Sequence, residues 1–78
     1  MATLRLFATV RVAAGTGKAT FAGDTVHEVL DAATAEYGEA FAALVPVCRI
    51  WVNGESAEAT TAVSDADEVA LLPPVSGG

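Results

Sequence analysis

The N-terminal residues alternate between two faces with a period of two. Over residues 3–12 one face carries Leu4, Leu6, Ala8 and Val10, and the other carries Thr3, Arg5, Phe7, Thr9 and Arg11. This alternation is typical of a β-strand that buries one face. It predicts a single strand over residues 3–12, then a turn at 13–17 and a returning strand at 18–22.

The hydrophobic period then changes to that of a helix. Apolar residues recur three or four positions apart at Val26, Val29, Leu30, Ala33 and Tyr37, which places them on one side of an α-helix. Thr25 and Glu28 have the spacing of a capping box at its start, and Gly38 is a common kind of helix end. A second short helical turn is expected over residues 39–45, before Pro46.

Strand spacing returns in the last third of the chain. Residues 48–52 form a strand with alternate apolar positions, and Asn53-Gly54 is a strong hairpin signal. A weak strand at 56–59, a turn at 65–67 and a final strand at 68–72 follow. Two strands, a helix and two or three strands predict an α+β fold, in which a mixed sheet of four or five strands packs on one main helix. The first and last strands should lie side by side in its centre.

Strand parity also predicts an exposed sheet face. The positions expected to face the helix are Leu4, Leu6, Ile50, Val52, Val69 and Leu71, which leaves Phe7, Trp51, Ala70 and Leu72 on the other side. So short a chain has no second layer for that side, and exposed aromatic residues are typical of binding surfaces. We therefore expect a docking surface with Phe7, Trp51 and Leu72, unless a bulge reverses the register or a loop covers them.

Composition narrows the function. The 78 residues are enough for one domain, and the net charge of −6 argues against nucleic-acid binding, which needs a basic footprint. An acidic surface favours a protein partner with a basic docking face, or serves only solubility. No stretch is long and apolar enough for a signal peptide or a membrane span. With a single cysteine no internal disulfide is possible, so a cytoplasmic location is expected.

Few side chains are suited to catalysis or metal binding. His27 is the sole histidine and is expected in solvent at the start of the helix, whereas Cys48 is expected to act as a small apolar residue. The run from Gly15 to Lys18 lacks the glycine spacing of a phosphate-binding loop. We therefore expect the folded body to bind no metal or cofactor and to have no active site.

The last six residues differ in character from the rest. They read Pro73-Pro74-Val75-Ser76-Gly77-Gly78. The prolines favour an extended path, and two glycines let the backbone enter a slot too narrow for side chains. We expect residues 1–72 to fold as one domain and residues 73–78 to form an extended, flexible tail that presents the Gly78 carboxylate to another protein. A merely frayed end is the simpler alternative.

Three motifs together resemble the MoaD/ThiS family. They are Leu6-Phe7-Ala8 with Arg11 and Ala14-Gly15, then Val52-Asn53-Gly54, and finally Asp67-Glu68-Val69 through the prolines to the diglycine. The family consists of ubiquitin-like sulfur carriers with the β-grasp fold. The form of the tail is most similar to the MoaD branch, the small subunit of molybdopterin synthase.

The resemblance implies that Gly78 is the reactive residue. A MoeB/ThiF-type adenylating enzyme would use ATP and magnesium to adenylate its carboxylate, and a persulfide sulfur donor would then convert it to a thiocarboxylate. In the MoaD branch a MoaE-like large subunit carries the catalytic residues and uses this sulfur to build the dithiolene of molybdopterin. The chain would thus be no enzyme on its own.

The resemblance also assigns positions within the chain. The tail residues that would enter the partner are Pro73, Pro74, Val75, Ser76 and Gly77, and the docking residues are Phe7 and Leu72. Trp51 is added from strand parity alone. Ser56 falls where some members carry an apolar contact residue, so a smaller patch is expected.

The tail chemistry suits other functions as well. The sulfur could serve the synthesis of cysteine, thiamine or a specialised metabolite. Alternatively, Gly78 could be joined to lysines of target proteins, as in a ubiquitin-like modifier, or the chain could be a passive binding module. One residue added after Gly78 should disable carriers and modifiers but not a passive module.

Overall fold

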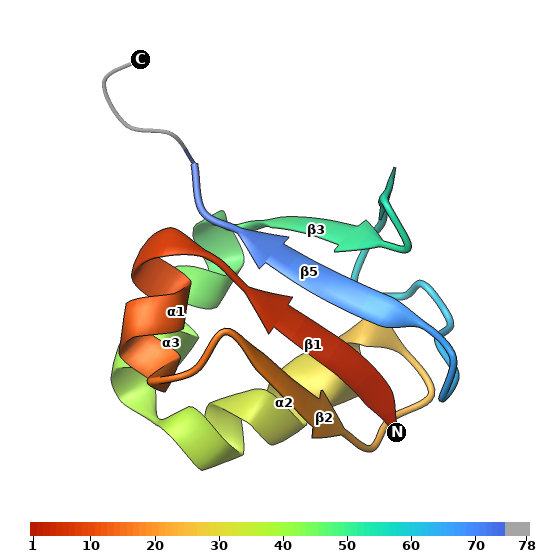
Figure 1. The fold of residues 1–78 in the computed structure, drawn as a ribbon, viewed down its shortest axis with the longest axis horizontal. Coiled ribbons are helices and arrows are strands. Elements are labelled where there is room, and N and C mark those ends of the chain that lie inside the picture. The colour runs from red at the N-terminus through yellow and green to blue at the C-terminus, as the bar shows by residue number, and fades with distance from the viewer. Residues whose placement is uncertain (75–78) are drawn as a thin grey trace.

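The computed structural model describes residues 1–74. Within them, five strands form one mixed sheet in the order β2-β1-β5-β3-β4 (Figure 1). The strands are β1 (Ala2–Leu6), β2 (Lys18–Phe21), β3 (Arg49–Val52), β4 (Glu55–Ser56) and β5 (Glu68–Leu72). β1 and β5 run parallel in the centre, and the other pairs are antiparallel. The α+β fold class and the central position of the first and last strands are confirmed.

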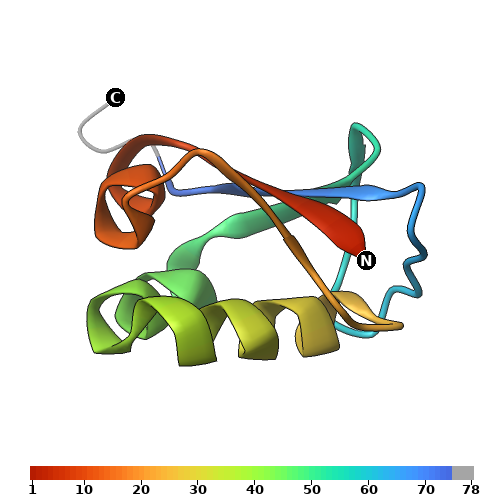
Figure 2. The ribbon, with the colours of Figure 1, turned by 60° about the horizontal axis from the view of Figure 1, so that its bottom comes forward.

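The helices α2 (Val26–Tyr37) and α3 (Glu39–Leu44) lie on one side of the sheet (Figure 2). α2 buries four of its predicted apolar residues, namely Val26, Val29, Leu30 and Ala33. They meet the inward strand residues Leu4, Leu6, Val69 and Leu71, which are at most 2% exposed. Among the described residues, none of the helices is both long enough and apolar enough to cross a membrane.

The start of α2 shows the predicted cap with one change. The Glu28 backbone N–H donates to Thr25 Oγ1 at 3.2 Å, as expected. The Glu28 carboxylate, however, accepts from the Asp24 N–H at 2.9 Å, one residue before Thr25. The chain comes so close here that a Cβ on Gly23 would lie 2.9 Å from both the Glu28 Cβ and the Val29 nitrogen.

The single strand predicted over residues 3–12 is wrong beyond Leu6. Ala8–Ala14 forms the helix α1, and Ala8 itself has a φ of 52°, which turns the chain out of the extended conformation. Gly15 ends the helix in the left-handed conformation, and its N–H donates to the carbonyls of Arg11 and Val12. The alternation was misleading because Val10 is buried in the helix just as it would be in a strand. Val12, the next position on the same face of the predicted strand, is 81% exposed.

Two further boundaries differ from the prediction. β4 is only Glu55–Ser56 rather than 56–59, and Pro46 lies inside a 3₁₀ turn (Val45–Val47) that extends α3. α3 itself is anchored by the fully buried Phe41, whose ring centroid lies 5.2 Å from that of Tyr37. The hairpin at Asn53-Gly54 is confirmed, with φ of 52° and 83°, values that a type I′ turn requires.

Candidate docking face

Strand register places one row of side chains on the sheet face opposite α2. Lys18 pairs with Arg5, Arg5 with Ala70, and Ala70 with Trp51 across four neighbouring strands. One step nearer the tail, Leu72 pairs with Arg49, and Phe7 follows Arg5 by two residues in extended backbone. We call these residues the docking face: Arg5, Phe7, Lys18, Arg49, Trp51, Ala70 and Leu72.

No layer formed by residues 1–74 covers the docking face (Figure 2). Phe7 is 39% and Leu72 36% exposed, and Trp51 is partly exposed beside them. The register runs without a bulge, so the predicted position of these three residues is confirmed, while their role in docking stays a prediction. Ser56 lies opposite Trp51 and is exposed, so the apolar part of the face ends at the edge strand β4.

Arg5 holds the apolar and charged parts of the face together. Its guanidinium carbon lies 5.9 Å from the centroid of the Phe7 ring, a distance typical of a cation–π contact. On its other side, Nη1 is 3.5 Å from Glu68 Oε2. Both groups are well exposed, so this ion pair adds little stability. Its effect is to orient the guanidinium beside Phe7.

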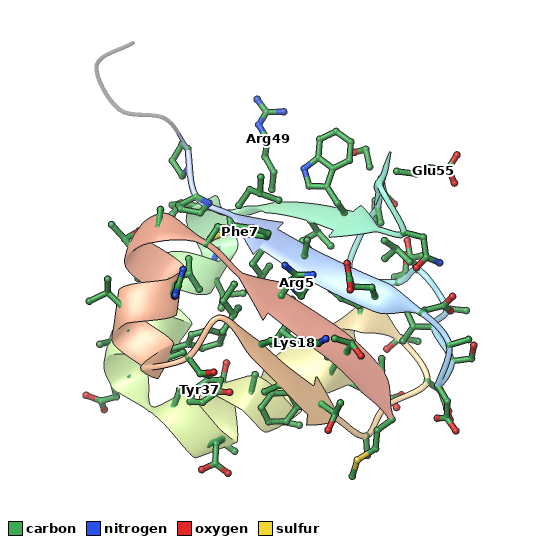
Figure 3. The ribbon with its side chains drawn as sticks, viewed as in Figure 1. Arg5, Phe7, Lys18, Tyr37, Arg49 and Glu55 are labelled. Carbon is green, nitrogen blue, oxygen red and sulfur yellow. The ribbon has the colours of Figure 1, made fainter. Side chains whose placement is uncertain are left out.

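The charges of the molecule are unevenly distributed. Three of the four basic residues, Arg5, Lys18 and Arg49, lie on the docking face (Figure 3). Glu68 is the one carboxylate within 4 Å of an arginine or lysine nitrogen in residues 1–74. The expectation that an acidic chain offers an acidic surface to a partner is therefore wrong for this face. Net charge alone conceals this, because the three residues become neighbours only through the order of the strands in the sheet.

The tail begins directly beside the docking face. β5 ends at Leu72, and Pro73 and Pro74 follow outside any helix or strand. Because β5 is a central strand, the chain leaves the sheet between β1 and β3 (Figure 1). The remaining predicted tail residues, Val75, Ser76, Gly77 and Gly78, lie outside the described residues. The described part therefore supplies an uncovered surface and, next to Leu72 at its border, the base of the tail.

The other reactive side chains form no site with this face. Burial raises the pKa of the Cys48 thiol, and its Sγ donates to the Leu44 carbonyl at 3.2 Å, so it stays a protonated, weakly reactive thiol. His27 is exposed, with Nε2 3.2 Å from Asp31 on the same helix. Both placements agree with the sequence expectation.

The arrangement of strands and helices defines the fold class of the protein. A mixed sheet on one main helix, with the first and last strands parallel in its centre, is the ubiquitin-like β-grasp arrangement. A family model described as the ThiS family matches residues 4–78. The chain belongs to this family of small sulfur carriers, which are not catalytic subunits.

Solved structures agree with this assignment. SAMP1 from Haloferax volcanii, a small archaeal modifier protein, is 33% identical over 99% of this chain and 98% of its own, with a TM-score of 0.83. The Amycolatopsis orientalis BexX/CysO complex gives 25% identity over 100% of both chains and a TM-score of 0.85. A chain in the complex of subunits 1 and 2 of the molybdopterin-converting factor from Helicobacter pylori is 27% identical. The match covers 99% of this chain and 97% of that chain, with a TM-score of 0.72. No curated protein matches the chain.

Proposed function

We propose that this chain carries sulfur as a thiocarboxylate on Gly78 and is the small subunit of a molybdopterin synthase. The family match that extends to residue 78 is the observation that carries this proposal. The likeness to a molybdopterin-converting factor subunit supports the pathway, as does the Pro-Pro-Val-Ser-Gly-Gly sequence of the tail.

Activation of Gly78 has a clear chemical requirement. An ionised carboxylate is a poor electrophile, so an adenylating enzyme of the MoeB/ThiF type would join it to AMP from ATP and magnesium and release pyrophosphate. A persulfide sulfur would then attack the carbonyl carbon and expel AMP, and a thiol would cleave the S–S bond to leave the thiocarboxylate. All reactive groups except Gly78 would belong to the partners, including a MoaE-like large subunit.

The docking face would orient the tail for these steps. Two of the similar structures are complexes with another protein, BexX/CysO and subunits 1 and 2 of the converting factor. A partner bound to Phe7, Trp51 and Leu72 would hold the base of the tail at Pro73 in a fixed place. The proline pair would then extend the chain into the partner's active site, because φ of each proline is fixed.

One experiment tests the carrier function directly. The chain is incubated with a MoeB/ThiF-type enzyme, ATP, magnesium and a persulfide donor, and its intact mass is measured. The carrier function requires the exchange of one oxygen for sulfur, absent in a variant with one residue added after Gly78. Conversion of the pterin precursor by the loaded chain with a MoaE-like subunit then tests the pathway. An unchanged mass would contradict the whole proposal.

A second function, attachment to other proteins, is favoured by the likeness to SAMP1. It needs the same activation of Gly78 but transfers the carbonyl to a lysine amine instead of exchanging oxygen for sulfur. The two functions separate in a purification under denaturing conditions. Peptides that join Gly78 to a lysine through an isopeptide bond support attachment, and their absence beside abundant thiocarboxylate supports the carrier.

A further inference from the structure

We propose that the docking face selects a partner surface with carboxylate side chains around an apolar centre, although this chain is itself acidic. The inference rests on the proposed function, since the partner meant is the adenylating enzyme that receives the tail. It concerns the charge of that enzyme's surface, which neither the family match nor the similar structures specify.

The strongest observation is a pair of like charges inside the sheet. Arg5 and Lys18 are direct cross-strand partners on β1 and β2, and both lie on the exposed face (Figure 3). Like charges directly opposite each other destabilise a sheet. The chain has ten acidic residues with which to neutralise them, yet only Glu68 is close, and it reaches Arg5 alone among residues 1–74. An arrangement that costs folding stability at an exposed position is better explained by binding.

Apart from Glu68, the acidic residues lie on other parts of the molecule. Five lie on or beside α2 and α3, the layer behind the sheet: Asp24, Glu28, Asp31, Glu36 and Glu39. Four lie in β4 or in the loops around it and before β5: Glu55, Glu58, Asp65 and Asp67. Three of the four basic side chains therefore lie on the exposed face of the sheet, whereas five of the ten acidic residues lie in the layer behind it and four lie in β4 or the loops around it and before β5. An acidic partner would attract the docking face and repel the helical layer.

The basic side chains also lie around the apolar residues of the docking face, as expected for the rim of an interface. Arg49 pairs with Leu72 at the tail end of the face, while Lys18 lies on β2, on the far side of Arg5. Arg5 lies beside Phe7 at 5.9 Å. Phe7 and Leu72 thus have a cation on each side. Interfaces commonly have an apolar core and a polar rim, so the complementary surface has its carboxylates at the rim.

The test compares variants of equal net charge. Arg49→Gln removes a cation from the face, and Ala35→Glu adds an anion at an exposed position of α2. Each lowers the net charge of −6 by one unit. Association with the purified adenylating enzyme is measured by stopped flow at rising sodium chloride, with intact-mass thiocarboxylate formation followed separately. A double variant, Lys18→Gln with Arg49→Gln, has Ala35→Glu with Ala40→Glu as its control.

The expected results depend on where the charge is changed. For the native chain, the association rate should fall as salt rises, because attractive steering is screened. At low salt, Arg49→Gln should slow association roughly threefold and the double variant roughly tenfold, and the difference should vanish at high salt. The control variants in α2 and α3 should associate at the native rate or slightly more slowly.

Several outcomes would overturn the inference. Equal rates for Arg49→Gln and Ala35→Glu, or a native rate that rises with salt, would show that net charge alone acts. If thiocarboxylate forms normally in that case, the carrier function stands and only the charge selection falls. Tight binding of a single-stranded oligonucleotide that Arg49→Gln abolishes, without any effect of this variant on the enzyme, would assign the face to another class of partner.

Discussion

At the scale of single residues, Gly23 is required both by its backbone conformation, with a φ of 157°, and by the space around it. A methyl group there would lie 2.9 Å from the Val29 backbone nitrogen, which cannot move without disturbing α2. Gly23→Ala should therefore lower the free energy of unfolding by about 3–5 kcal/mol, because the steric cost adds to the backbone strain. Gly38→Ala meets no atom within 4 Å, but its φ of 90° and ψ of −167° lie in a region that only glycine adopts readily, so backbone strain alone should cost about 1–3 kcal/mol. Urea denaturation measures both, and equal losses would refute the steric explanation.

Phe7 is the residue at which stability and binding should separate. It occupies the N-cap position of α1 without a side-chain cap, a position where serine is favourable. In Phe7→Ser this gain offsets the lost contact with Arg5, so the free energy of unfolding should change by less than about 1 kcal/mol.

Binding of Phe7→Ser to the adenylating enzyme should weaken more than tenfold, as for a central interface residue. Titration calorimetry measures the affinity, and Val12→Ser, on an 81% exposed valine of α1 outside the docking face, serves as the control. Unfolding of Phe7→Ser, or native affinity in a folded protein, would show that the ring is not a docking residue.

At the scale of elements, the carboxylate of Asp67 joins the β3–β4 hairpin to the start of β5. It accepts from Asn53 Nδ2 at 2.8 Å and from the Ser64 N–H at 2.8 Å, and these hydrogen bonds hold its pKa below the ordinary 3.8. A lowered pKa in the folded state means stability that is complete above 3.8 and lost as the pH falls below it.

The native chain should therefore lose stability in acid more steeply than Asp67→Ala, which should be weaker at neutral pH and show a flatter profile. Urea midpoints between roughly pH 6 and pH 3 measure this. Glu55→Gln, which removes a carboxylate from the same hairpin, should retain the native slope. Parallel profiles for Asp67→Ala and the native chain would rule out the hydrogen bonds as the cause.

The elements also show which parts of the fold can be predicted from sequence. Strands β3 and β5 and helix α2 were predictable because each buries one face at a constant period. Helix α1 was missed because Val10 fits both the strand and the helix pattern, and the chain leaves the strand at Ala8, whose φ is 52°. That conformation has no signal in the residue type. The spacing of Val10, Ala13 and Ala14 before Gly15 was the available hint of a helix.

At the scale of the whole molecule, the apolar part of the docking face was predictable and its charge was not. Phe7, Trp51 and Leu72 follow from strand parity, which depends only on neighbours along each strand. The cluster of Arg5, Lys18 and Arg49 needs the order of β2, β1, β5 and β3. Residues far apart in sequence become neighbours only through that order, so a sum of charges over the chain conceals the basic cluster on this face.

In the whole molecule, the stability of the folded domain and the reaction at the C-terminal tail depend on different residues. In the described part, every core residue lies between Ala2 and Leu71. Gly77→Phe should therefore change the free energy of unfolding by less than about 0.5 kcal/mol. It should nevertheless abolish thiocarboxylate formation if the tail must pass through a slot that admits only glycine. Thermal unfolding and intact mass, measured on one preparation, decide both points.

Because the docking face is untouched, the variant should still compete with the native chain for the adenylating enzyme. If Gly77→Phe is loaded with sulfur at the native rate, the activating enzyme does not require a residue without a side chain at this position.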